Sequence, residues 1–239
     1  MAAFLQSLIA GFGAGGTYAL LALSAVLIYR GSGVINFGTG GLALVGAGAF
    51  YEVKQTAHAP TILALVAAVA AAALVGSLVE ILVMQRMRQA SPIARVVATL
   101  GLAAAVQGAA QIRYGSNSQF LSSFLPETSL HIAGVTVLLD RMVILAITAG
   151  LGVGLWVLYK YTRFGIATTS VAENERVAAT LGWSPARISI VNWAIGGGLA
   201  GLGGAISSSV VSHGFSYTSL SLAVVPALSA ALLGAPVGR

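Results

Sequence analysis

The chain has no cysteine, and only 8% of its 239 residues are charged. Without cysteine it forms no disulfide bond and offers no thiolate to a metal ion. A soluble globular domain carries charge on about a quarter of its residues, so this chain has too little polar surface for that class. It also lacks the His-Glu-X-X-His metal motif and the Gly-X-X-X-X-Gly-Lys-Ser/Thr phosphate loop. We therefore expect no catalytic residue, no metal ion and no cofactor.

Long apolar runs are what the chain has instead, and hydrophobic residues make up 57% of it. A membrane-spanning helix needs roughly 20 mainly apolar residues, and the strict polar and apolar alternation of barrel strands is missing. The sequence predicts one all-α domain, residues 1–239, a polytopic transmembrane helical bundle of about seven spans. The apolar windows are Phe4–Ile28, Val34–Val53, Thr61–Met84, Ile93–Ile112, Met142–Tyr159, Ile188–Val211 and Leu220–Leu233.

The basic residues lie singly between these windows, so the net charge of +6 indicates membrane topology and contact with membrane lipid rather than nucleic acid. Cytoplasmic loops of membrane proteins carry the excess of Lys and Arg. That rule is satisfied in a bacterial inner membrane with the N-terminus outside. Nine basic residues then lie inside (Arg30, Arg86, Arg88, Arg95, Lys160, Arg163, Arg176, Arg187, Arg239) and three outside (Lys54, Arg113, Arg141).

Two polar segments separate the windows most widely. Residues 113–141 are rich in turn-forming residues and are predicted to be a periplasmic loop. Residues 160–187 are predicted to be a cytoplasmic loop that contains a short capped helix. In that loop Ser170 and Glu173 have the spacing of a capping box, and Gly182 suits a left-handed helix end. Ser184-Pro185 then predicts the start of the next span.

Three stretches that carry motifs follow one another along most of the chain. They are Thr17-Tyr18-Ala19-Leu20 with the run from Tyr29 to Gly40, then Arg88 to Gln107 with Ser91-Pro92 opening a span, and finally Arg163-Phe164-Gly165 with Val171-Ala172-Glu173-Asn174, Ala178, Leu181-Gly182-Trp183 and Arg187. In this order and spacing they resemble the permeases of branched-chain amino acid ABC transporters, the LivH-type family.

The resemblance implies the membrane-spanning permease subunit of an ABC importer for branched-chain amino acids or related small polar solutes. It implies three partners: ATP-binding cassette subunits that hydrolyse ATP, a second permease subunit or homologous half, and a periplasmic or extracellular substrate-binding protein. Members of the family usually continue with further spans, so we expect this chain to be either a truncated permease or the N-terminal part of a longer one. The residues expected to couple to the ATPase are Arg163, Gly165, Glu173, Asn174, Arg176, Val177, Ala178, Leu181 and Gly182.

A cluster of glycines around Asn36 and Phe37 interrupts two apolar runs. Broken helices in membranes line solute paths, where free amides and carbonyls suit a zwitterionic amino acid. A tight cytoplasmic turn explains the same cluster, and the sequence leaves both interpretations open. The residues expected along a substrate path are Asn36, Phe37, Gly38, Gln107 and Gln111.

Glu80 is the acidic residue closest to an apolar window, and Arg86 and Arg88 follow it. We expect an ion pair at the membrane interface rather than a group that carries protons. The glycines between Gly196 and Gly204 predict close helix packing.

Two other classes of protein stay open at this point. A self-contained channel or ion-coupled secondary transporter would need no ATPase. An intramembrane enzyme or scaffold is disfavoured because His58, His131 and His213 are scattered and no carboxylate accompanies Ser207–Ser209.

Overall fold

The computed structural model describes residues 2–115, 119–120, 123–124, 129–132, 135–208, 214–215, 220 and 222–234, and helices make up most of them. The long helices are α1 (Ala2–Ser32), α3 (Thr61–Val79), α4 (Pro92–Tyr114), α5 (Leu139–Tyr161) and α8 (Pro185–Ile206). The shorter ones are α2 (Thr39–Tyr51), α6 (Arg163–Glu173), α7 (Glu175–Thr180) and α10 (Val224–Gly234). One turn of π-helix extends α2 (η1, Glu52–Thr56), and another extends α3 (η2, Glu80–Met84).

Short strands occur in the described parts of the 113–141 segment and near residue 214. β1 (Gln119–Phe120) pairs antiparallel with β4 (Gly214–Phe215). β2 (Ser129–Ile132) pairs antiparallel with β3 (Val135–Leu138), with Ile132 opposite Val135. These strands are too short to change the class of the fold.

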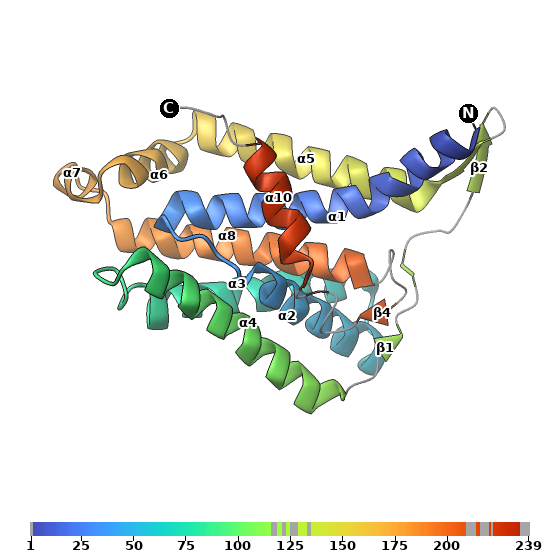
Figure 1. The fold of residues 1–239 in the computed structure, drawn as a ribbon, viewed down its shortest axis with the longest axis horizontal. Coiled ribbons are helices and arrows are strands. Elements are labelled where there is room, and N and C mark those ends of the chain that lie inside the picture. Colours follow the sequence, from blue (N-terminus) through green and yellow to red (C-terminus); the bar gives the residue numbers. More distant parts are fainter. Residues whose placement is uncertain are drawn as a thin grey trace.

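Among the described residues, five helices are long and apolar enough to cross a membrane: Gly11–Ser32, Thr61–Met84, Pro92–Tyr114, Leu139–Tyr161 and Pro185–Ile206. Each overlaps one of the apolar windows, which confirms the prediction of an all-α bundle with several membrane spans. In Figure 1 the axes of α1, α5 and α8 run roughly along the horizontal, whereas α4 slopes obliquely below them.

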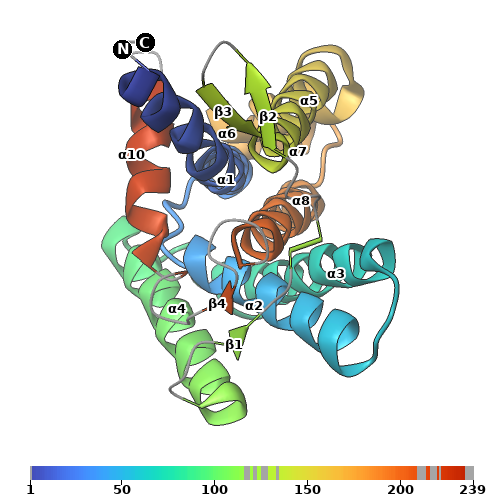
Figure 2. The ribbon, with the colours of Figure 1, turned by 90° about the vertical axis from the view of Figure 1, so that its right-hand side faces the viewer.

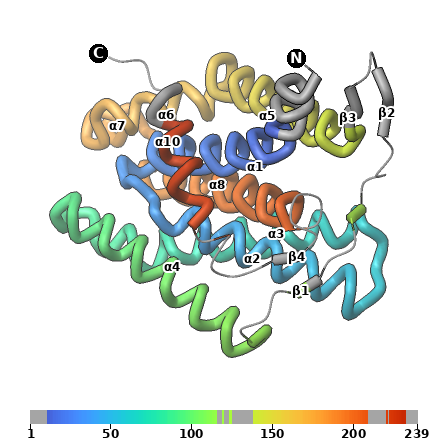
Figure 3. Tube along the Cα trace, turned by 45° about the vertical axis from the view of Figure 1, so that its right-hand side comes forward, coloured from blue at the N-terminus to red at the C-terminus, as the bar shows by residue number. Residues whose placement is uncertain are grey.

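The other two apolar windows are also helical, over shorter lengths. α2 begins at Thr39 because residues 33–38 are irregular, and with η1 it continues to Thr56. α10 has 11 residues. It lies across α1, as Figures 1 and 3 show.

α8 is the most buried span and packs against α1, α2 and α3, which surround it in the end-on view of Figure 2. Glycine makes this packing possible. A Cβ on Gly197 would lie 2.5 Å from the Ala72 carbonyl oxygen, and one on Gly201 would lie 2.7 Å from that of Ala68. The helices thus approach to backbone contact, as in small-residue interfaces in membranes.

The polar ends of the helices gather in two groups, one at each end of the bundle. At one end the Arg113 guanidinium lies 2.8 Å from a Glu52 carboxylate oxygen, and Lys54 Nζ donates to Thr61 Oγ1 at 2.9 Å. At the other end α6, α7 and the link from α3 to α4 lie together, on the left of Figure 1. Spans that cross a membrane in alternate directions place successive polar loops at opposite ends of the bundle, as these two groups do. Which end faces the cytoplasm stays a prediction.

Candidate functional site

Residues 162–185 form an elbow of two short helices, α6 and α7, that leads from α5 into α8. Thr162 caps α6, because its hydroxyl oxygen accepts from the Gly165 amide at 3.3 Å. Asn174 caps α7, since its Oδ1 accepts from the amides of Arg176 at 3.0 Å and Val177 at 3.1 Å. The elbow is therefore a defined structure at both helix starts.

The end of α7 follows the sequence prediction. Gly182 has φ of +87°, the left-handed conformation that favours glycine. The amide of Trp183 then donates to the Ala178 carbonyl at 3.1 Å. Pro185 begins α8 after Ser184, as the sequence predicts.

The predicted helix start at Ser170 is wrong. Ser170 lies inside α6, where its hydroxyl donates to the Ile166 carbonyl at 2.9 Å. Asn174 interrupts the helix with φ of −156° and supplies the cap four residues later. Both residue types are good caps, and the packing of α6 against α5 and α8 decides which one is used.

We predict that Asn174→Ala loosens α7 by about 1 kcal/mol, because two amides of its first turn lose their acceptor. The measurement is hydrogen exchange at the amides of Arg176 and Val177, which should become faster. Ser170→Ala is the matched control and should leave these amides protected. Faster exchange in the Ser170 variant alone would show that the cap lies at Ser170.

The two sides of α7 differ in exposure. Ala178 is 1% exposed and faces the bundle, whereas Val177 is 53% exposed and Leu181 69% exposed. The helical spacing predicted that Val177, Ala178 and Leu181 share one apolar face, but in the structure only Ala178 packs against the bundle. Glu173, Asn174, Arg176 and Gly182 are exposed as well.

α6 is fixed to the bundle by close packing and by one buried amide. Gly165 lies against the Tyr159 carbonyl, where a Cβ would overlap the backbone. The Asn192 side chain, fully buried on α8, donates to the Thr168 hydroxyl of α6 at 3.3 Å and accepts from the Tyr159 hydroxyl of α5. Arg163 is exposed at the start of α6. The structure thus brings the predicted coupling residues together on one elbow that is anchored to α5 and α8.

The predicted substrate-path residues fall into two groups. Asn36 is 1% exposed, and its Oδ1 accepts from the Gly38 amide at 2.8 Å, while the Phe37 amide donates to Thr99 Oγ1 on α4 at 3.1 Å. The Nδ2 of Asn36 has no hydrogen-bond partner. Figure 1 shows the blue link from α1 to α2 running from the left-hand end back toward the middle of the bundle.

The glutamines of α4 stand apart from this break. Asn36, Phe37 and Gly38 meet α4 around Thr99 and Leu102, about two helical turns from Gln107. Gln107 is half-buried, and Gln111 is exposed. The structure therefore brings the first three predicted residues together and does not place Gln111 with them.

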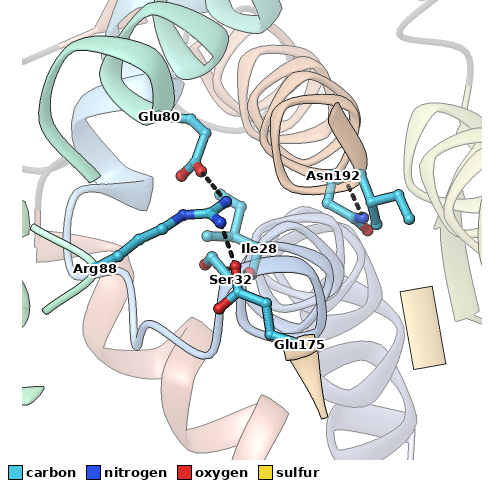
Figure 4. A network of polar contacts seen from close by, with 7 residues as sticks. Ile28, Ser32, Glu80, Arg88, Glu175 and Asn192 are labelled. Atoms are coloured by element: carbon cyan, nitrogen blue, oxygen red, sulfur yellow. Dashed lines mark hydrogen bonds and ion pairs between the residues drawn. The ribbon is translucent and has the colours of Figure 1, made fainter. Parts of the chain in front are cut away.

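A cavity of about 360 Å³ lies at the α7 end, between the end of α1, η2, the start of α4 and the elbow. Glu80, which is 1% exposed, lies at its buried side. Arg88 bridges Glu80, 3.8 Å away, and Glu175 of α7, and Figure 4 shows its guanidinium between the two carboxylates.

The predicted ion pair of Glu80 with Arg88 is present, but Arg86 donates instead to the Leu82 carbonyl at 2.7 Å. Glu80 is also more buried than an interfacial pair would be. Arg95, Glu175 and Ser189 join it in the cavity. Sequence reasoning missed these three because no motif links them, and only the tertiary packing of three separate segments brings them together.

No group of three or more His, Cys, Asp or Glu residues that could hold a metal ion occurs within the parts of the chain that the structure describes. His58, on the link between η1 and α3, has a positive φ of 52°. His213 lies outside the described residues.

A bundle of membrane-length helices with a buried glycine-packed span, a broken helix and an anchored elbow defines a polytopic membrane protein. Residues 7–237 match the family described as branched-chain amino acid transport system / permease component. The chain belongs to this family of permeases.

Three relatives illustrate the similarity. The branched-chain amino acid permease protein BraD of Pseudomonas aeruginosa is 26% identical over 97% of this chain and 79% of its own length. LivH of Escherichia coli strain K12 is 23% identical over 85% of this chain and 70% of its own. A probable LivH of Methanocaldococcus jannaschii is 27% identical over 78% of this chain and 61% of its own. No solved structure matches the chain significantly.

Proposed function

We propose that this permease is the membrane-spanning subunit of an ABC importer that carries branched-chain amino acids or related small polar solutes across the bacterial inner membrane. The family match over residues 7–237 carries the proposal, and the matching relatives are named for high-affinity transport of these amino acids. ATP-binding cassette subunits would hydrolyse ATP, and a substrate-binding protein would deliver the solute. A second permease subunit or homologous half would complete the pathway.

The elbow formed by α6 and α7 is the proposed contact with the ATP-binding subunits. Three of its large apolar side chains are exposed, Ile166 on α6 and Val177 and Leu181 at α7, and such an exposed apolar surface is what docking requires. The cap at Asn174 opposes fraying, and Asn192 joins α6 to two spans. A force applied to the elbow would therefore move α5 and α8 together with it.

With this proposed contact, the α7 end would lie in the cytoplasm and the N-terminus outside, as the positive-inside rule predicts. The break at Asn36, Phe37 and Gly38 is proposed to border the substrate path, with Gln107 on the flank of α4. The unpartnered Nδ2 of buried Asn36 supports this role, because it offers a neutral donor inside the bundle.

Uptake of radiolabelled L-leucine tests the proposal. The permease is reconstituted in liposomes with candidate ATPase subunits, a second permease subunit and a substrate-binding protein. We expect uptake that requires ATP inside and persists when proton and sodium gradients are collapsed, and that falls in Asn36→Ala. Uptake that needs no ATP but stops with the ion gradient would instead establish an ion-coupled secondary transporter. Full uptake by Asn36→Ala would remove Asn36 from the path.

A further inference from the structure

Three buried or partly buried polar atoms around the cavity at the α7 end have no hydrogen-bond partner. Glu80 Oε2 belongs to a side chain that is 1% exposed, and the Ser189 hydroxyl to one that is 2% exposed. The Ser189 hydroxyl lies close enough to the Glu80 carboxylate to interact with it, although neither Ser189 Oγ nor Glu80 Oε2 makes a hydrogen bond of normal geometry. The third atom is Arg95 Nε. Leaving such groups buried and unpaired is unfavourable, so their concentration in one cavity indicates a site for a polar ligand.

The charges around the cavity select for a ligand with both signs of charge. Arg88 is already shared between Glu80 and Glu175, which leaves Glu80 Oε2 as a free acceptor for a cation. The C-terminal turn of α1, Tyr29–Ser32, also lines the cavity and brings in a third guanidinium, that of Arg30. Arg95 contributes a free guanidinium donor for an anion.

A purely anionic ligand would meet the carboxylates of Glu80 and Glu175, and a purely cationic one would meet the guanidinium groups of Arg30, Arg88 and Arg95. The lining also includes the apolar side chains of Val34, Met84 and Val171. A volume of about 360 Å³ lies at the lower end of the range of small-ligand pockets. These properties fit a small α-amino acid with an uncharged, apolar side chain.

We propose that this cavity is a binding site for a zwitterionic amino acid, with the ammonium group at Glu80 and Ser189 and the carboxylate at Arg95. The proposal deepens the transport function and rests on it for the identity of the amino acid. The site lies at the α7 end of the bundle, where the solute would leave toward the ATP-binding subunits. Because Arg88 joins Glu80 to Glu175 on α7, a movement of the elbow would change the charge beside the bound ligand.

Direct binding measurements on the permease in lipid nanodiscs, with any subunits that co-purify, test the site. The probes are L-leucine, L-leucinol, which keeps the ammonium and lacks the carboxylate, and 4-methylpentanoate, which keeps the carboxylate and lacks the ammonium. Glu80→Gln is expected to weaken L-leucine and L-leucinol at least tenfold and to spare 4-methylpentanoate. Arg95→Gln is expected to weaken L-leucine and 4-methylpentanoate and to spare L-leucinol.

Glu52→Gln is the matched control, because Glu52 forms an ion pair with Arg113 at the opposite end of the bundle. It should bind all three probes as the wild type does. Ser189→Ala removes a hydroxyl without changing charge and should weaken L-leucine and L-leucinol to a smaller extent, which keeps the test valid if Glu80→Gln does not fold.

Two results would overturn the site. One is a wild-type permease that binds no L-leucine, and the other is a set of folded Glu80, Ser189 and Arg95 variants that bind it with unchanged affinity. In either case ATP-dependent uptake of L-leucine would still support the transport function. Conversely, binding that depends on Glu80 without any uptake would support the site and contradict the importer.

Discussion

Leu181→Asp is expected to abolish co-purification of the ATP-binding subunits with the permease while the permease itself stays folded. Leu181 is 69% exposed and touches no core cluster, so a carboxylate there remains hydrated in the isolated permease. In a docked complex the same carboxylate would be buried against an apolar surface, where an unpaired charge is strongly unfavourable. We expect a loss of about 2 kcal/mol or more, roughly thirtyfold in affinity.

Val177→Asp, at the neighbouring exposed position of α7, should have the same effect. Ile93→Asp is the matched control, because Ile93 is 76% exposed in the first turn of α4, where an acidic side chain is favourable. The measurement is the amount of ATP-binding subunit retained on the tagged permease, together with the melting temperature of each variant. Unchanged retention in both α7 variants would place the contact elsewhere on the permease.

Gly204→Ala is expected to destabilise the bundle by about 3 kcal/mol, at the upper end of the range for overpacked cores. A Cβ on Gly204 would overlap the Ala43 carbonyl oxygen of α2 and lie 2.6 Å from its carbon. The obstacle is backbone rather than a flexible side chain, so α2 and α8 would have to separate. α8 packs on three helices, α1, α2 and α3, and the separation would disturb all of these contacts.

Gly154→Ala provides a control with the opposite sign. Gly154 lies within α5, and nothing else lies within 4 Å of the position its Cβ would take. There the same substitution removes only the conformational freedom of glycine and should stabilise the helix by up to about 1 kcal/mol. Thermal unfolding in detergent micelles measures both variants. Equal melting temperatures for the two would show that the approach of α2 to α8 does not limit stability.

Much of the fold was predictable from the sequence, since five of the apolar windows became helices long enough to span a membrane. Membrane helices satisfy their own backbone and show their length directly in the sequence. Helix ends were predicted correctly where a single residue type favours one conformation, as with Gly182 at the end of α7 and Pro185 at the start of α8. The prediction failed at Ser170, where two good cap residues stand four positions apart and long-range packing chose between them.

The candidate site was predictable only in part. The break at Asn36 and the exposed residues of α7 follow from local patterns of glycine and of capping. The cavity at the α7 end does not, because Glu80, Arg95, Glu175 and Ser189 come from separate segments and no spacing connects them. The burial of Glu80 likewise depends on helices that are distant in the sequence.

The chain has no cysteine and few charges, and its composition and long apolar runs were enough to predict a helical membrane bundle. They suffice because they fix the solvent that each segment tolerates. Its motifs also indicated the permease family. Only tertiary contacts settle that Asn174 rather than Ser170 caps α7, that Ala178 is buried while Val177 and Leu181 are exposed, and that five charged residues line one cavity. The physical reason is that caps, burial and ion pairs depend on which distant helices come into contact.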